Sequence, residues 1–246
     1  MGKLYIVGLG PGGALDTTPR AEAALRESQV IIGYTGYIDL IRDRFPDKEF
    51  IDSAMTTEVY RCHLAEGRVR MGQTAAMVCS GDAGVYGMAS LLLQVCAPYP
   101  QLEIEVIPGV TAATAGAALL GAPLGNDFAA VSLSTALTPW ETIEKRLRAA
   151  AAGDFVLCLY NPASRKRPDT LRRAAQVLLE TLPPQTPCGL AQNVSREGET
   201  SWLCTLGELP GQRADMFTTV IVGNSRTRVI NGRLVTPRGY EQKGEL

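Results

Sequence analysis

A short, unbroken apolar run followed at once by a glycine-rich loop is the feature that most constrains this fold. Residues 75–79 read Ala-Ala-Met-Val-Cys, as expected of a strand buried on both faces of a parallel sheet. The loop Ser80-Gly-Asp-Ala-Gly-Val-Tyr-Gly87 follows, and a second apolar stretch from about Met88 to Cys96 predicts a helix. Ligands of open α/β sheets bind beyond the carboxyl ends of strands, so a ligand site is expected at this loop. An ordinary strand-to-helix turn is the alternative.

Composition limits the class of protein. The 246 residues suffice for one large domain or two small ones, and 46% are hydrophobic and 20% charged, as in soluble globular proteins. The formal net charge of −1 gives no global sign of a nucleic-acid or anionic-membrane partner. The sequence contains no signal-peptide pattern and no apolar run long enough to span a bilayer. We therefore expect a cytoplasmic protein without a membrane or nucleic-acid partner.

The cysteines do not form a recognisable metal or disulfide pattern. Six cysteines are scattered along the chain, none in a Cys-x-x-Cys motif, and most fall inside apolar runs. They are therefore predicted to be reduced core residues, and no metal site is expected. His63 is the only histidine and stands in an arginine-rich helical segment, so a surface position is expected for it.

A glycine loop near the N-terminus resembles a dinucleotide fingerprint. Gly8, Gly10 and Gly13 satisfy the G-x-G-x-x-G pattern after a predicted strand at 3–7. That fingerprint needs a helix that opens inside the loop, whereas the helix start here comes later, with Thr18 as cap and Pro19 at the first helical position. The next apolar run, 30–32, ends in Gly33-Tyr34 and not in an acid that would bind the ribose. A nicotinamide or flavin protein is therefore only an alternative, and a P-loop is not supported because no Gly-Lys-Ser/Thr follows.

Strand and helix patterns begin anew after the segment 121–125, Gly-Ala-Pro-Leu-Gly, which is the best linker in the chain. The sequence therefore predicts two α/β domains, residues 1–122 and 123–246, with a ligand crevice between them. In the second half, Thr138-Pro-Trp-Glu141 predicts a capping box and Asn231-Gly232 predicts a hairpin turn. The small side chains from Thr111 onwards allow a flat ligand, or simply a tightly packed sheet, to lie against a helix.

Five motifs, taken together and in order, resemble the tetrapyrrole methylase family. They are Gly8-Leu-Gly-Pro-Gly12, Ser80-Gly-Asp82, Pro108-Gly-Val-Thr-Ala112, Tyr160-Asn161 and Asn193-Val-Ser195. The family consists of S-adenosylmethionine-dependent methyltransferases of cobalamin and sirohaem synthesis. The resemblance covers essentially the whole chain. It implies two α/β domains that hold the cofactor in the cleft between them, usually in a homodimer, with S-adenosylhomocysteine as the product.

The same resemblance implies the cofactor contacts. They fall on residues of three motifs in the first half of the chain and two in the second: Pro11, Ser80, Gly81, Asp82, Val85, Thr111, Ala112, Asn161 and Val194. The physical chemistry is consistent with this assignment. Glycine-loop amides and Asp82 suit the polar methionine end of the cofactor, and the small face at Thr111-Ala112 admits adenosine.

Three longer segments resemble the branch of the family that methylates C17 and contracts the corrin ring. They are the segment from Ser80 to Ala89, Leu159-Tyr-Asn-Pro-Ala-Ser-Arg165, and Thr236-Pro-Arg-Gly-Tyr240. This branch converts precorrin-3B into precorrin-4 in cobalamin biosynthesis. The counterpart that acts on cobalt-factor III or cobalt-precorrin-3 in the anaerobic pathway has the same motifs and is the main alternative.

The sequence does not identify a catalytic residue. Methyl transfer from a sulfonium depends mainly on positioning, so no dedicated base is required. Ring contraction would benefit from an acid or base, for which Asp16, Asp127, Ser134 and His63 are candidates. The substrate is a polycarboxylate, and Arg165, Lys166 and Arg167 are the first candidates to bind it. A binding-only member of the family is a further alternative, but its cofactor motifs would have no reason to be complete.

Overall fold

The computed structural model describes residues 2–164 and 166–244. Contacts within the chain divide it into two compact units, Met1–Ala112 and Ala113–Leu246. The division falls before the junction that the sequence predicts after residue 122. The physical reason is α5 (Ala112–Leu120), whose apolar face packs into the core of the second unit through Ala113, Ala117 and Leu120.

The first unit is built on a fully parallel sheet. Its five strands lie in the order β3-β2-β4-β1-β5. The strands are β1 (Lys3–Gly8), β2 (Val30–Tyr34), β3 (Glu49–Ser53), β4 (Ala75–Cys79) and β5 (Glu103–Ile107). Every residue of β4 is buried, which confirms the strand predicted at 75–79.

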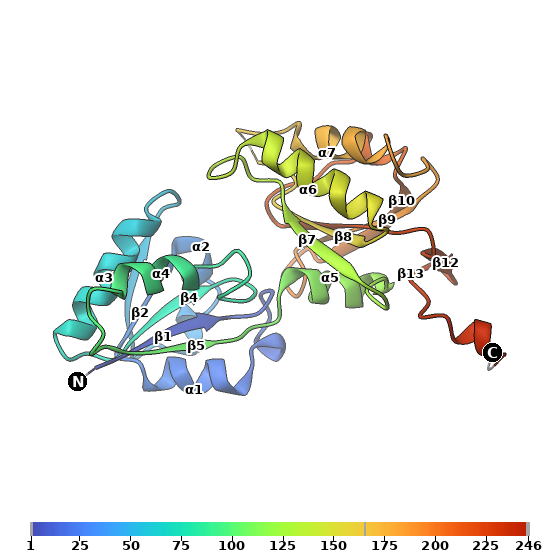
Figure 1. Ribbon diagram of the computed structural model, residues 1–246. Helices are drawn as coiled ribbons and strands as arrows, with labels where there is room; N and C mark the ends of the chain where they lie inside the picture. The colour runs from blue at the N-terminus through green and yellow to red at the C-terminus, as the bar shows by residue number, and fades with distance from the viewer. Residues whose placement is uncertain (1, 165, 245–246) are drawn as a thin grey trace. The chain divides into compact units, whose positions relative to one another are not determined.

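Helices cover both faces of this sheet. Alternate residues of β1 point to opposite faces, so Tyr5 and Val7 join the core under α1 (Pro19–Glu27), and Leu4 and Ile6 join the core on the other side. That second core contains residues of α3 (Glu58–Arg70) and α4 (Ala89–Cys96). Figure 1 shows α1 on one face and α3 and α4 on the other.

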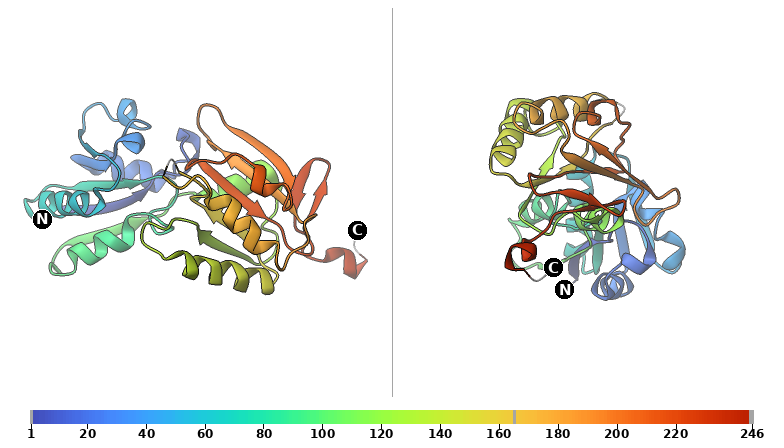
Figure 2. Two further views of the ribbon diagram at one scale, coloured as in Figure 1. Left: turned by 90° about the horizontal axis from the view of Figure 1, so that it is seen from above. Right: turned by 90° about the vertical axis from the view of Figure 1, so that its right-hand side faces the viewer.

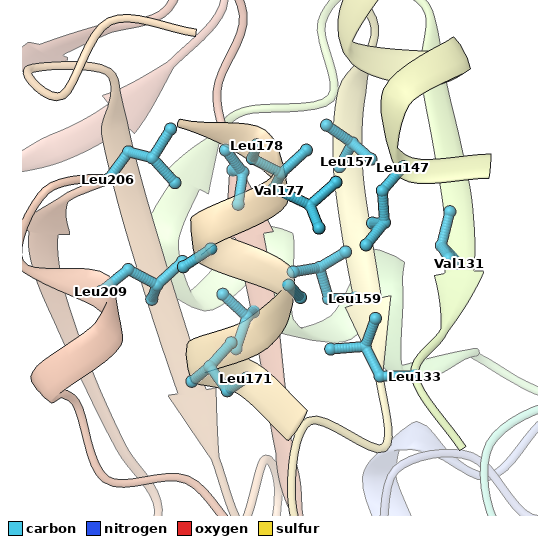
Figure 3. Packing of buried hydrophobic residues seen from close by; sticks show 14 of the residues in the cluster. Val131, Leu133, Leu147, Leu157, Leu159, Leu171, Val177, Leu178, Leu206 and Leu209 are labelled. Carbon is cyan, nitrogen blue, oxygen red and sulfur yellow. The ribbon is translucent and has the colours of Figure 1, made fainter. Parts of the chain in front are cut away.

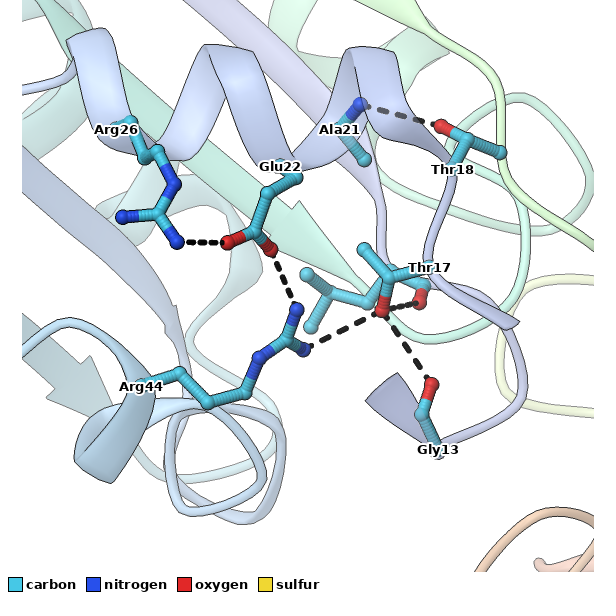
Figure 4. Close-up of polar contacts among 8 residues, drawn as sticks. Gly13, Thr17, Thr18, Ala21, Glu22, Arg26 and Arg44 are labelled. Carbon is cyan, nitrogen blue, oxygen red and sulfur yellow. Dashed lines mark hydrogen bonds and ion pairs between the residues drawn. The ribbon is translucent and has the colours of Figure 1, made fainter. Parts of the chain in front are cut away.

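The start of α1 is fixed by the contacts that the sequence predicts. Thr18 accepts a hydrogen bond from the amide of Ala21 at 3.1 Å, and Pro19 is the first helical residue (Figure 4). The neighbouring Thr17 hydroxyl donates to the carbonyl of Leu9 at 3.2 Å. Arg44 donates to the carboxylate of Glu22 and to the hydroxyl of Thr17. These contacts tie the loop after β1 to the first turn of α1.

The second unit contains a mixed sheet in the order β10-β9-β11-β8-β7. Its strands are β7 (Phe128–Ser132), β8 (Val156–Tyr160), β9 (Pro187–Gln192), β10 (Thr200–Thr205) and β11 (Thr218–Val222). β7 and β8 are parallel, and β11 is antiparallel to both β8 and β9. β7, β8 and β9 therefore run in one direction, and their carboxyl ends lie at one edge of the sheet.

This sheet is also covered on two faces. Leu157 and Leu159 of β8 pack under α6 (Trp140–Ala152) and α7 (Thr170–Leu178), in the core drawn in Figure 3. Val156 and Cys158 point to the opposite face, where α5 lies (Figure 2, right). A Cβ added to Gly116 of α5 would lie 3.2 Å from the Cβ of Ala191 in β9. The small residues of α5 therefore serve tight packing of the helix on the sheet.

A small three-stranded sheet completes the second unit. β12 (Arg228–Ile230) and β13 (Arg233–Val235) form the hairpin predicted around Asn231-Gly232, whose φ angles are 49° and 74°. β13 also pairs in parallel with β6 (Gly121–Ala122). The segment that the sequence indicates as a linker is therefore partly tied down within the second unit.

One local prediction is wrong. The capping box at Thr138–Glu141 does not form, because Pro139 has extended backbone angles, is itself the N-cap of α6 and offers no side-chain acceptor. Between Tyr34 and Phe45 the chain forms the short helix α2 (Thr35–Ile38) and a separate 3-10 turn, η2 (Arg42–Arg44). Ile41 and Phe45 turn into the core there, which favours a broken path over a continuous helix.

Candidate functional site

The topology of the first sheet creates a site at one edge. From β1 the chain passes to α1 on one face, whereas from the neighbouring β4 it passes to α4 on the opposite face. Connections that leave two adjacent parallel strands in opposite directions open a crevice at the carboxyl ends of those strands. The two glycine loops identified in the sequence follow these two strands.

The two loops are joined by their backbones. The amide of Gly10 donates to the carbonyl of Gly81 at 3.0 Å, and the amide of Gly81 donates to the carbonyl of Gly10 at 2.7 Å. Both glycines have positive φ, 82° and 68°, a conformation that other residues rarely adopt. The loop after β1 is therefore part of the same structure as the loop after β4, and it is not a separate dinucleotide fingerprint.

A third loop joins them after β5. A Cβ added to Gly109 would lie 2.2 Å from the carbonyl oxygen of Gly81 and 2.7 Å from the backbone of Gly8. No side chain fits between these three backbones. The carboxyl ends of β4, β1 and β5 are thus held in direct contact.

Asp82 organises this junction. Its Oδ1 accepts hydrogen bonds from the amides of Gly84 at 2.8 Å and Val85 at 3.1 Å, and its Oδ2 accepts one from the amide of Gly109 at 2.9 Å. The carboxylate therefore shapes its own loop and connects it to the loop after β5. Contact between Asp82 and a cofactor remains a prediction. The structure shows a second role for this carboxylate, which is to hold the two loops in place.

Seven of the nine predicted cofactor residues belong to these three loops of the first unit. They are Pro11 after β1, Ser80, Gly81, Asp82 and Val85 after β4, and Thr111 and Ala112 after β5. The fold therefore gathers at one sheet edge residues that are distant in sequence. Val85 is exposed, Ser80 is half-buried, and Gly81 is buried under its neighbours.

The other two predicted residues share an edge of the second sheet. Asn161 follows β8 and Val194 lies just beyond β9, at the edge where β7 also ends. Asn161 has a φ of 53° and donates through Nδ2 to the hydroxyl of Ser132 at 3.0 Å. The preceding Tyr160 accepts a hydrogen bond at its hydroxyl from the amide of Ala113, at the first turn of α5.

The predicted substrate residues follow Asn161. Arg165 lies outside the described residues, and Lys166 is exposed. Arg167 is half-buried and donates through Nη1 to the hydroxyl of Ser134 at 2.6 Å. Arg167 and Ser134 therefore belong to the same polar group at the edge where β7 and β8 end.

The remaining acid–base candidates are dispersed. Asp16 ends a 3-10 turn, η1 (Ala14–Asp16), in the loop after β1. Asp127 precedes β7 and so lies at the edge of the second sheet opposite to Asn161. His63 lies on α3 with 61% of its side chain exposed, in agreement with the predicted surface position.

The sequence did not identify one charged residue that lies next to the loop after β4 in the first unit. Arg61 of α3 is only 4% exposed, and it lines a pocket together with Ser80 and Tyr86 of the loop after β4. The arginine-rich composition of α3 instead suggests an exposed helix. A signal is nevertheless present, because Arg61, Ala65 and Val69 recur at the four-residue spacing of one buried helix face.

The thiols have no evident role in this site. All six cysteines are free, and only Cys204 is not fully buried. Burial raises the pKa of the thiols of Cys62 and Cys158 to about 12 and of Cys79 to about 11, so these three stay protonated near neutral pH. Across residues 2–164 and 166–244, no cluster of three or more His, Cys, Asp or Glu side chains could hold a metal. No helix in the same ranges is long and apolar enough to cross a membrane.

Comparison with known proteins gives consistent matches over the whole chain. The family description Tetrapyrrole (Corrin/Porphyrin) Methylases matches residues 3–210. The chain is 43% identical to the probable cobalt-factor III C(17)-methyltransferase of Salmonella typhimurium, over 96% of this chain and 99% of that protein. It is 40% identical to the precorrin-3B C(17)-methyltransferase of a Sinorhizobium species, over 97% of each. The crystal structure of the methyltransferase CobJ superposes with a TM-score of 0.91 at 38% identity, covering 96% of this chain and 100% of that one.

Proposed function

Because the chain belongs to the tetrapyrrole (corrin/porphyrin) methylase family, we propose that it methylates C17 of precorrin-3B. The methyl donor is S-adenosylmethionine, and the reaction includes contraction of the corrin ring to give precorrin-4 in cobalamin biosynthesis. The observation that carries this proposal is the full-length similarity, at about 40% identity, to proteins named as C17-methyltransferases.

The first-unit site fits the cofactor chemically. S-adenosylmethionine supplies an activated methyl group on a positively charged sulfur. The loop after β4 offers the carboxylate of Asp82 as its only charge, which is of the sign that favours a sulfonium and an ammonium. A Cβ added to Gly84 would meet only an oxygen of Asp82, at 3.2 Å, so the backbone there is open to close approach.

The residues of this chain would act mainly by holding and orienting. The hydrogen bonds from Gly84, Val85 and Gly109 to Asp82 fix the loop before any ligand arrives. A preformed loop reduces the entropy lost when donor and acceptor are brought into line, and such positioning accounts for a large part of catalysis in transfer reactions. Contacts of Asn161 and Val194 with the cofactor are part of the same proposal.

The metal content of the substrate is the point on which the two candidate substrates differ. Cobalt-factor III is the second candidate, because the Salmonella typhimurium relative named for it is as similar to this chain as the one named for precorrin-3B. A nicotinamide-dependent oxidoreductase is no longer supported, because the three glycines that suggest it lie within the matched family region and one of them, Gly10, bridges to Gly81.

The proposal extends to the substrate contacts, the assembly and the location. Arg165, Lys166 and Arg167 are proposed to bind carboxylate side chains of the tetrapyrrole. We also propose a homodimer, as the family resemblance implies, which light scattering of the purified protein would test. A cytoplasmic location is proposed from the sequence and is testable by fractionation of the source cells.

Calorimetric titration with S-adenosylhomocysteine, with NAD as the parallel control, tests the cofactor. Micromolar binding of the first and none of the second is expected. Transfer of a labelled methyl group from S-adenosylmethionine to precorrin-3B or to cobalt-factor III then tests the reaction and separates the two substrates. Binding of NAD alone, or no transfer to either tetrapyrrole, would contradict the proposed function.

A further inference from the structure

A pocket in the first unit lies beside the loop after β4 and is lined mainly by residues outside the cofactor motifs. Its wall includes Tyr34, Tyr37, Glu58, Arg61, Ser80 and Tyr86. These residues come from the carboxyl ends of β2 and β4, from α2, from the first turn of α3 and from the glycine loop. Four of these six carry a hydroxyl group and two carry a charge. The rest of the wall is Met55, Val78, Cys79, Gly87 and Met88, so the pocket combines an apolar surface with a few polar groups.

Arg61 is the unusual member of this wall. Only 4% of it is exposed, yet no carboxylate lies within ion-pair distance of it among the described residues. Its Nε donates to the hydroxyl of Ser53 at 2.9 Å, and its Nη2 donates to the carbonyl of Ala54 at 3.0 Å. These neutral acceptors orient the guanidinium without neutralising its charge.

The acid that could pair with it is directed elsewhere. Glu58 stands one turn earlier on α3, at the i, i+3 spacing that permits a salt bridge. Instead, an oxygen of Glu58 accepts a hydrogen bond from the amide of Thr56 at 3.1 Å. A buried cation that is held in place but not paired is costly in a protein interior, and an anion that enters the pocket would remove that cost.

We propose that Arg61 binds a carboxylate side chain of the tetrapyrrole substrate in this pocket, beside Ser80 and the tyrosine hydroxyls. The proposal rests on the proposed function, because that substrate is a polycarboxylate. Guanidinium groups bind carboxylates in a bidentate manner, and a buried one does so with little competition from water. The pocket adjoins Ser80, the first residue of the cofactor loop, so a carboxylate bound there would position the macrocycle relative to the methyl donor.

The cofactor also has a carboxylate, and the experiment must separate the two sources. We would compare the wild type with Arg61→Gln and Arg61→Lys. The dissociation constant of the tetrapyrrole is measured by absorbance titration, which does not depend on turnover. Dissociation constants of S-adenosylhomocysteine and of 5′-methylthioadenosine, which lacks the carboxylate, are measured by calorimetry. Arg26→Gln, an arginine of α1 whose side chain is 66% exposed, is the matched control.

The expected result is at least a tenfold weaker affinity for the tetrapyrrole in Arg61→Gln, partial recovery in Arg61→Lys, and unchanged affinity for both nucleosides. Unchanged tetrapyrrole affinity in a folded Arg61→Gln variant would overturn the inference and leave Arg61 a structural residue. Weaker binding of S-adenosylhomocysteine but not of methylthioadenosine would also overturn it, by assigning the pocket to the cofactor carboxylate. A wild type that binds the tetrapyrrole without methylating it would contradict only the proposed function.

Discussion

The carboxylate of Asp82 accepts a hydrogen bond at 2.9 Å from the amide of Gly109, a residue that follows a different strand. This contact connects the loop after β4 to the loop after β5 across the end of β1. The side chain predicted from the sequence to contact the cofactor thus also holds together the loops that would surround it.

Replacing Asp82 should therefore affect binding and stability together. Asp82→Ala leaves the amides of Gly84, Val85 and Gly109 without their acceptor, and we expect a loss of about 2 kcal/mol in the free energy of unfolding. The affinity for S-adenosylhomocysteine should fall at the same time. Urea unfolding and calorimetry measure the two effects, with the exposed Asp47→Ala as control. Unchanged cofactor affinity in Asp82→Ala would remove this residue from the site.

Two glycines should respond to alanine in opposite directions. Gly109→Ala places a Cβ 2.2 Å from the carbonyl oxygen of Gly81, so we expect about 1–3 kcal/mol of destabilisation from overpacking. A Cβ added to Gly67, inside α3, would meet no atom within 4 Å, and Gly67→Ala should gain about 1 kcal/mol from helix propensity. Thermal unfolding of both variants checks the pair. A stabilised Gly109→Ala would show that the three loops are not held as described.

His63→Ala should leave methyl transfer nearly intact. The side chain is 61% exposed on α3, and an oxygen of Glu66 lies 4.0 Å from its Nδ1. The measurement is the initial rate of labelled methyl transfer at saturating cofactor. An activity loss greater than about tenfold, which corresponds to about 1.4 kcal/mol in the activation barrier, would require a catalytic role for this histidine.

Arg167→Ala should raise the KM for the tetrapyrrole while the affinity for S-adenosylhomocysteine stays the same. The guanidinium is held by the hydroxyl of Ser134, at 2.6 Å, and is thereby pre-oriented for a carboxylate. Lys166→Ala, at an exposed and less constrained position, should have the smaller effect. An equal loss of cofactor and substrate affinity in Arg167→Ala would indicate misfolding and not a substrate contact.

Cys204 should be the cysteine that reacts first with N-ethylmaleimide. The neighbouring thiol of Cys188 lowers the pKa of the Cys204 thiol, so its reactive thiolate form persists to lower pH than in an ordinary cysteine. The other five cysteines are buried. The modification is followed by mass spectrometry at about pH 7 and about pH 8, on either side of the usual onset of thiol ionisation. One cysteine should be alkylated faster than the others, and the Cys204→Ser variant should lack this fast reaction. Fast modification of Cys62 or Cys79 instead would show that the first core opens readily.

Much of this site could be predicted from local sequence. The apolar run 75–79 indicates the strand because burial restricts the residues that fit, and Gly81 indicates the loop because its positive φ favours glycine. Thr18-Pro19 and Asn231-Gly232 are equally informative, since a cap and a tight turn depend on adjacent residues.

Features that depend on distant contacts could not be predicted in this way. Nothing near Asp82 in the sequence shows that its carboxylate reaches Gly109. The spacing around Arg61 indicates a buried helix face, but it does not show that the arginine lacks an acidic partner there. The sequence pattern assigns α5 to the first domain, whereas its membership depends on packing against Val156, Cys158 and Ile221. Tertiary contacts, and not local propensity, decide each of these points.

The bridge between Gly10 and Gly81 has a consequence for the dynamics of the first unit. The amides of Leu9, Gly10 and Gly81 all donate across the two loops, and the amide of Gly109 donates to Asp82. None of the three loops can open without breaking hydrogen bonds of another. Exchange of these amides with deuterated solvent should therefore follow one shared opening event. When a ligand binds to any one of the loops, exchange should slow in all three, along the whole carboxyl edge of the sheet.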